Sequence, residues 1–184
     1  VHRDLKPGNV ILTKDRSAYL LDWGLAATLD PEADARLPTL ANTAPGAGTP
    51  QYMAPEMYDA EFGAIEPRTD VYLLGGLLYE ILYGQAPHTG VVSRDALTSR
   101  FDQPIPFPDH AAVELVAIAR RCLQVRGDDR FSSAEALRRE LASWLGHYDS
   151  IRLADEGALA RGTEALPDRL LESMTAFSRA IRGW

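Results

Sequence analysis

Two short apolar runs near the start of the chain predict its sheet structure. Residues 10–13 (VILT) and 18–21 (AYLL) flank the polar segment Lys14-Asp15-Arg16-Ser17. Such runs, joined by a short polar segment, predict a β-hairpin with a four-residue turn. From residue 22 to about residue 55 the chain is rich in Ala, Pro, Gly and Thr, without a sustained period. An irregular segment of that length is usually functional or disordered.

The pattern beyond this segment predicts helices. Residues 69–83 are almost uniformly apolar after Asp70 and end at Gly84, which predicts a central helix buried on all sides. Further helices are predicted at 92–100, 111–123 and 132–145. The last begins Ser132-Ser133-Ala134-Glu135, with the capping-box spacing of a hydroxyl followed by Glu three residues on. We therefore expect a mainly α fold, a helical bundle around residues 69–83 with one hairpin.

The residues after 147 form a tail with a pattern of its own. Leu170, Met174, Phe177 and Ile181 make an apolar stripe after Pro167, which predicts an amphipathic helix. Residues 151–166 predict a weaker one. The spacing faintly resembles the second helix of a tetratricopeptide repeat, a unit that needs neighbours to bury its apolar face. The tail is either a simple linker helix or the start of a repeat region, and its helices are candidate surfaces for protein partners.

Composition and charge narrow the functional classes. Hydrophobic residues make up 46% of the 184 positions and charged residues 24%, an ordinary globular mixture. The net charge of −7 argues against a nucleic-acid or anionic-membrane surface. No apolar stretch reaches the length of a membrane span. The single cysteine, Cys122, lies in an apolar stretch, which indicates an inert core thiol and a reducing, cytoplasmic compartment, with a membrane tether outside these residues left open.

Three motifs carry the chemical information. His2-Arg3-Asp4-Leu5-Lys6-Pro7-Gly8-Asn9 opens the chain, Asp22-Trp23-Gly24 follows the predicted hairpin, and residues 48–56 (GTPQYMAPE) close the irregular segment. Five fixed residues of the first motif, at about 5% each, would coincide by chance about once in three million positions. In order and spacing the motifs resemble the C-terminal lobe of a eukaryotic-type Ser/Thr protein kinase, most like the bacterial members, over residues 1–147.

The resemblance implies a division of catalytic roles. Asp4 would accept and orient the substrate hydroxyl, and Lys6 would contact the transferred phosphate. Asn9 and Asp22 would hold Mg²⁺ through a carbonyl oxygen and a carboxylate. Ile11 would lie beneath the adenine of ATP. The implied reaction is transfer of the ATP γ-phosphate to Ser or Thr hydroxyls of protein substrates.

Other positions are implied to be structural. Asp70 matches the aspartate that holds the catalytic-loop backbone, and Glu56 and Arg130 match a buried ion pair. His2 and Trp23 resemble two members of the packing column between the lobes. Trp23 stands where Phe is usual and keeps an aromatic body.

The resemblance also makes residues 28–49 an activation segment. Thr39 and Thr43 are the expected phosphorylation sites, because a phosphate adds charge and acceptors that can dock on a guanidinium. Arg3 is the implied partner of that phosphate. Thr49 resembles the threonine that hydrogen-bonds the catalytic Asp and Lys, where a phosphate would be repelled.

Some expected features of a whole kinase are missing from the sequence. Lys6 and Lys14 are its only lysines, and no Gly-x-Gly-x-x-Gly occurs. We therefore interpret residues 1–147 as a C-terminal lobe without its N-terminal lobe, and residues 148–184 as a helical tail. Such a fragment is expected to be inactive alone. The alternatives are a pseudokinase scaffold or, disfavoured by the segment 48–56, a small-molecule phosphotransferase.

Overall fold

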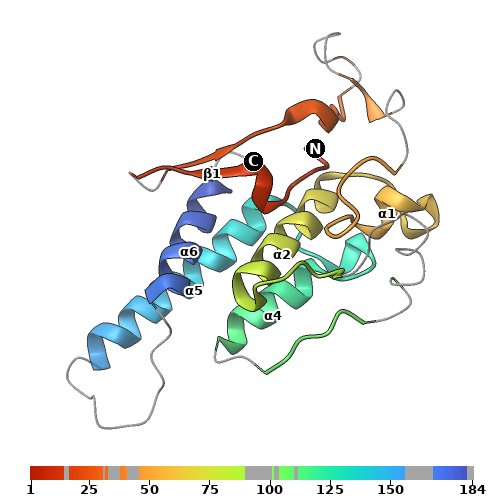
Figure 1. The fold of residues 1–184 in the computed structure, drawn as a ribbon. Helices are drawn as coiled ribbons and strands as arrows, with labels where there is room; N and C mark the ends of the chain where they lie inside the picture. The colour runs from red at the N-terminus through yellow and green to blue at the C-terminus, as the bar shows by residue number, and fades with distance from the viewer. Residues whose placement is uncertain are drawn as a thin grey trace.

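The computed structural model describes residues 1–14, 17–30, 32, 38–40, 46–89, 101, 104–109, 112–155 and 168–181, with the side chains of 149–155 left aside. The predicted helix at 92–100 and Thr43 lie outside these residues. Figure 1 shows a hairpin lying across a group of helices. In chain order the elements are β1 (Val10–Leu12), β2 (Ala18–Leu20), α1 (Pro55–Tyr58), α2 (Pro67–Tyr83), α4 (Val113–Cys122), α5 (Ala134–Asp155) and α6 (Asp168–Ala180).

The hairpin prediction is confirmed. β1 and β2 pair antiparallel with Val10 opposite Leu20, Ile11 opposite Tyr19 and Leu12 opposite Ala18. Because side chains alternate between the faces of a strand, Ile11 and Tyr19 share one face and the other two pairs share the opposite face. We call the face of Val10, Leu12, Ala18 and Leu20 the inner face, because this side meets the helices.

Helix α2 forms the centre of the fold, as predicted, and begins two residues earlier than expected. Pro67 occupies its first turn, where the missing amide hydrogen costs little. The Glu66 amide donates to Thr69 Oγ1 at 3.1 Å. At the other end Gly84 adopts a φ of +70° and donates to the Glu80 carbonyl. This left-handed position explains why a glycine ends the helix.

Helix α4 packs closely against α2. A Cβ built on Gly75 would lie 2.4 Å from the Cβ of Cys122, so the absence of a side chain at 75 permits this approach. Cys122 is completely buried, and this burial raises the pKa of its thiol well above the usual range. The expectation of a core thiol at 122 is confirmed.

Helix α5 runs ten residues beyond the predicted end at 145, through Gly146 to Asp155. Its buried side chains Leu137, Leu141 and Trp144 fix the helix against its neighbours, and Trp144 donates to Glu114 of α4 at 3.1 Å. Such packing outweighs the roughly 1 kcal/mol that a glycine costs inside a helix. The capping hydroxyl comes from Ser133, which accepts from the Ala136 amide, one residue later than the predicted box.

The predicted amphipathic tail helix is confirmed as α6. Leu170, Met174, Phe177 and Ile181 are all buried, and α6 contacts β2, α2 and α5. Figure 1 shows α6 beside α5, below the hairpin. The apolar stripe of the tail is therefore covered by this same chain. Among the described residues, no helix combines the length and apolar character that a membrane crossing needs.

Candidate active site

The loop of residues 2–9 is held from below by the central helix. Asp70, in the first turn of α2 and almost fully buried, accepts the His2 amide at 2.7 Å and the Arg3 amide at 3.0 Å. Burial raises the pKa of Asp70, and the two amide donors act in the opposite direction. Arg3 has a φ of +72°, an unfavourable angle for a residue with a side chain. The pair of bonds to Asp70 stabilises this backbone turn.

Asp4 lies at the centre of a compact polar cluster. Its Oδ1 accepts from the Thr49 hydroxyl at 2.7 Å, and its Oδ2 lies 2.9 Å from Lys6 Nζ and 3.1 Å from Asn9 Nδ2. Lys6 also donates to Thr49 Oγ1 at 2.7 Å. Residues 43 to 45 positions apart in sequence are thus joined around one carboxylate.

The cluster changes the acidity of Asp4. Burial alone would raise its pKa, but the hydrogen bonds from Lys6 and Thr49, the charge of Lys6 and the bond from Asn9 together lower it below the ordinary value. Asp4 is therefore an ionised carboxylate at neutral pH. An ionised, hydrogen-bonded carboxylate in this position can orient a hydroxyl and accept its proton.

Asn9 and Asp22 offer oxygen ligands beside the cluster. The Asn9 amide nitrogen is used in bonds to the Asp4 carbonyl and carboxylate, which leaves its Oδ1 as the group that can bind a cation. The Asn9 carbonyl accepts the Leu21 amide at 2.8 Å, so the residue before Asp22 is tied to Asn9. A carboxylate and an amide oxygen suit Mg²⁺. Among the described residues, no three or more His, Cys, Asp or Glu side chains gather as a metal site.

An aromatic contact joins the loop to the Asp22-Trp23-Gly24 turn. The His2 ring is buried and meets the Trp23 ring edge-on, with 4.9 Å between centroids. Asp22 adopts a left-handed φ of +57° and accepts the Gly24 amide. Trp23 is 59% exposed, and so presents an aromatic surface to solvent.

The outer face of the hairpin is apolar and exposed. Ile11 (47%) and Tyr19 (58%) project from it, and Leu21 next to it is also exposed. Ile11 was predicted to lie beneath adenine, and its exposure on this face leaves it accessible to a flat apolar group. Large apolar side chains in water usually mark a binding surface.

Arg3 and Thr39 each contact the beginning of the irregular segment, at Leu25 and Thr28. The Arg3 side chain is buried and directs Nη1 at the Leu25 carbonyl, 3.4 Å away. Burial lowers the pKa of its guanidinium, and the Asp70 carboxylate acts against that shift. Thr39 forms an isolated β-bridge with Thr28, and Thr28 lies three residues along the chain from Leu25.

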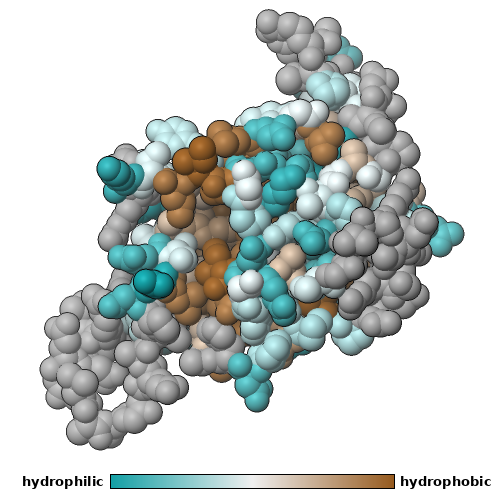
Figure 2. All heavy atoms as spheres, viewed as in Figure 1, coloured by the Kyte–Doolittle hydropathy of each residue, from teal (hydrophilic) through white to brown (hydrophobic). Residues whose placement is uncertain are grey.

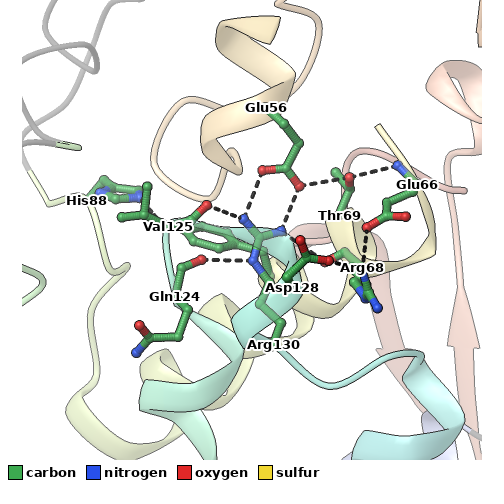
Figure 3. Close-up of polar contacts among 10 residues, drawn as sticks. Glu56, Glu66, Arg68, Thr69, His88, Gln124, Val125, Asp128 and Arg130 are labelled. Atoms are coloured by element: carbon green, nitrogen blue, oxygen red, sulfur yellow. Dashed lines mark hydrogen bonds and ion pairs between the residues drawn. The ribbon is translucent and has the colours of Figure 1, made fainter. Parts of the chain in front are cut away.

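The predicted pair of Glu56 and Arg130 is present and fully buried. Figure 3 shows two parallel bonds between the side chains, with Nη1–Oε1 at 2.6 Å and Nη2–Oε2 at 2.8 Å. Arg130 also donates to the carbonyls of Gln124, Val125 and Arg68. All five N–H donors of this guanidinium are therefore used, as a buried charge requires.

Sequence reasoning missed two parts of this arrangement. Thr69 donates to Glu56 Oε1 at 2.8 Å, and the hydroxyl of Tyr52 donates to the Glu80 carboxylate of α2. The second bond ties the segment after Thr49 to the central helix. A threonine at a helix start and a tyrosine in a loop have many other roles, so neither carried a distinctive pattern.

Comparisons with known proteins agree with this geometry. The model of the family described as the protein kinase domain matches residues 1–142. Serine/threonine-protein kinase PknB of Mycolicibacterium smegmatis is 34% identical over 145 residues, covering 77% of this chain and 22% of that protein. Probable serine/threonine-protein kinase SCO3848 of Streptomyces coelicolor is 32% identical, covering 88% of this chain and 24% of the relative. The chain thus spans about a quarter or less of the length of these relatives.

A solved structure supports the fold. The Cydia pomonella granulovirus kinase PK-1 superimposes with a TM-score of 0.54 at 21% identity, over 76% of this chain and 49% of the viral kinase. At that identity the likeness concerns the fold, which is the mainly helical kinase architecture expected from the sequence. Since the family match covers more than three quarters of its residues, the chain belongs to the protein kinase domain family.

Proposed function

We propose that this chain is the catalytic lobe of a protein serine/threonine kinase, which transfers the ATP γ-phosphate to Ser or Thr hydroxyls of protein substrates. The observation that carries the proposal is the Asp4 carboxylate held by Lys6, Thr49 and Asn9. These three donors occupy three of the about four lone-pair positions of a carboxylate. The remaining position, on Oδ1, suits an incoming hydroxyl.

The residues divide the work of transfer. Asp4 orients the substrate hydroxyl. The oxygen of that hydroxyl forms a bond to the γ-phosphorus while the bond between this phosphorus and the ADP oxygen breaks. The hydroxyl proton passes late to Asp4, because an acid of ordinary or lowered pKa cannot ionise an alcohol beforehand. The positive charge of Lys6 stabilises the negative charge of the phosphoryl group during transfer. Asn9 and Asp22 would hold Mg²⁺, which supplies neutralisation of the phosphate charge.

Nucleotide binding also needs a second lobe in this proposal. The exposed outer face of the hairpin, with Ile11 and Tyr19, is the floor on which adenine would lie, and Trp23 extends it. An N-terminal lobe would cover this floor and contribute a further lysine, since Lys6 and Lys14 are the only lysines of the sequence. The acidic net charge and the buried cysteine fit a cytoplasmic enzyme acting on proteins.

The test uses the chain joined to a kinase N-terminal lobe, from its own gene or from a related kinase. Asp4→Asn should reduce turnover by orders of magnitude and leave Mg²⁺-dependent nucleotide binding intact, because Asp4 faces the hydroxyl. Asp22→Asn should impair both. Retained turnover in Asp4→Asn would overturn the proposed chemistry, and nucleotide binding without turnover in the unmutated protein would favour a scaffold.

We further propose that phosphorylation at Thr39 and Thr43 switches this activity. Thr39 pairs with Thr28, three residues after Leu25, whose carbonyl accepts from Arg3. In this proposal a phosphate on the segment docks on that guanidinium and orders the loop. Mass spectrometry after incubation with ATP and Mg²⁺ should find these sites. If Thr39→Ala with Thr43→Ala changes neither the phosphate count nor the activity, the switch lies elsewhere.

A further inference from the structure

The outward side of helix α4 carries an open hollow of about 430 Å³. Its lining includes Val113, Val116 and Ala117 in the first half of the helix and Arg120 and Arg121 near its end. Val113 is 70% exposed, and Ala117 and both arginines are exposed as well. Figure 1 shows α4 below α2, whereas the hairpin lies above it. In Figure 2 hydrophobic and hydrophilic residues are intermixed on this lower part of the visible face, so this surface is separate from the candidate active site.

Two aromatic rings hold the arginine side chains in place. The guanidinium carbon of Arg120 lies 4.3 Å from the centroid of the Phe107 ring, and that of Arg121 lies 4.1 Å from the centroid of the Phe131 ring. A guanidinium that stacks on a ring keeps the N–H groups at its edges available for hydrogen bonds in its own plane. Because the stacking already restricts both side chains, a ligand that binds them has less conformational entropy to remove.

The charge of the two arginines is not matched on this surface. Within the described part of the chain, their side chains form ring contacts but no ion pair and no hydrogen bond. Asp129 lines the same hollow, and Glu114 and Glu140 line a second hollow that Arg121 shares toward α5. The net charge of −7 repels anions in general, so a negative partner would be attracted only locally. The complementary group is therefore an apolar side chain with carboxylates at a fixed distance from it.

The spacing along α4 sets that distance. Val113 and Arg120 are seven residues apart, which is about 10 Å along the helix axis at 1.5 Å per residue. An extended peptide covers this distance in about three residues. We propose that the outward side of α4 docks an acidic segment of a partner protein. Its apolar side chain lies on Val113, and its carboxylates, three and four residues later, pair with Arg120 and Arg121.

The test is an NMR titration of the ¹⁵N-labelled 184-residue chain with the peptide acetyl-Leu-Ser-Ser-Glu-Glu-amide. The backbone amides of α4 and the Nε–H groups of Arg120 and Arg121 should shift, whereas the amides of β1 and β2 should not. A peptide with Gln-Gln in place of Glu-Glu should bind about five- to tenfold more weakly, because two exposed charge pairs are lost. Acetyl-Leu-Glu-Glu-Ser-Ser-amide has the same composition but the wrong spacing, and should also bind more weakly.

Paired variants separate this site from a general attraction between charges. Arg120→Gln with Arg121→Gln should weaken binding of the Glu-Glu peptide by the same factor and leave binding of the Gln-Gln peptide unchanged. Arg139→Gln with Arg179→Gln removes the same charge from exposed positions on α5 and α6, and should leave both affinities unchanged. Asp129→Asn should strengthen binding of the Glu-Glu peptide, because it removes a like charge from the hollow.

Three results would overturn the proposal. The first is no shift in α4 with any peptide at millimolar concentration. The second is equal affinity of the Glu-Glu and Gln-Gln peptides for the unmutated chain, a comparison that does not depend on how well a variant folds. The third is that inorganic phosphate shifts both arginine Nε–H groups as strongly as the peptide does while Val113→Ser leaves peptide binding unchanged. The arginines would then attract any small anion, without an apolar contact at the largely exposed Val113.

Discussion

At the scale of single residues, the ionisation of Asp4 depends on its donors, and this gives a first prediction. Lys6→Met removes a hydrogen bond and a charge that lower the pKa of Asp4, whereas burial, which raises it, remains. The pKa should therefore rise in the variant. A ¹³C NMR titration of the Asp4 carboxyl measures the change, and Lys14→Met, which removes the exposed other lysine, is the control.

The sign of the effect on stability follows from the same pKa. A carboxylate whose pKa is lowered by folding stabilises the fold above its unfolded value of about 3.9, and this contribution disappears as the pH falls through the folded pKa. Lys6→Met should therefore lose part of the stability that the unmutated chain gains between acid and neutral pH. The same Asp4 midpoint in both proteins would contradict the assigned cause.

The pair of Glu56 and Arg130 gives a second prediction. Glu56→Ala should lower the free energy of unfolding by about 3–5 kcal/mol, because it leaves a guanidinium buried without its counter-charge. Adding Arg130→Met should restore part of this loss, as seen by chemical denaturation. Strictly additive losses would show that the residues do not interact. Glu135→Ala, at the partly exposed pair with Arg138, is the control and should cost far less.

The residues around this pair also show which contacts can be predicted from a sequence and which cannot. Glu56, Arg130, Asp70 and Asp4 could be predicted because each stands at a fixed place in a motif. The other partners of Arg130 are mostly main-chain carbonyls of residues 68, 124 and 125. Every residue type carries such a carbonyl, so no side-chain pattern could have revealed them.

At the scale of the elements, close contact between α2 and α4 makes a third prediction. Gly75→Ala would bring its Cβ to 2.4 Å from the Cβ of Cys122, so the helices must separate. The free energy of unfolding should fall by about 1–3 kcal/mol, the usual cost of overpacking. Denaturant unfolding provides the measurement.

The matched control is the same substitution in α5. A Cβ on Gly146 would meet no atom within 4 Å, so Gly146→Ala should gain about 0.5–1 kcal/mol from helix propensity alone. Opposite signs in the two variants would assign the loss at 75 to the contact with Cys122. Equal effects would mean that α2 and α4 do not approach so closely.

Element boundaries were predictable where local chemistry decides them. Gly84 ended α2 as expected, because a left-handed residue satisfies the last carbonyls of the helix. Gly146 did not end α5, because buried side chains before it hold the helix in place. The amphipathic pattern of α6 predicted a buried face but contained no information on which surface covers it. That surface combines β2, α2 and α5, which are distant in sequence.

At the scale of the whole molecule, the two faces of the hairpin differ in how much apolar surface they expose. Its inner face is partly covered by helices, with Leu12 at its end exposed, and its outer face exposes Ile11, Tyr19 and, beyond β2, Leu21 and Trp23. The polar cluster around Asp4 is already assembled without any further partner. Under the proposed function, these residues would supply the chemistry at the hydroxyl, whereas nucleotide affinity would depend on what covers the outer face.

The last prediction follows from this division. The 184-residue chain alone should bind Mg-ATP too weakly for micromolar affinity, because adenine would be covered on one side and the phosphates would meet no lysine beyond Lys6 and Lys14. Calorimetry with Mg-ATP measures this, and the same chain joined to a kinase N-terminal lobe is the control and should bind. The uncovered apolar face should also promote self-association, visible by sedimentation, and Tyr19→Lys with Leu21→Lys should reduce it. Micromolar binding of Mg-ATP by the chain alone would show that the outer face already suffices.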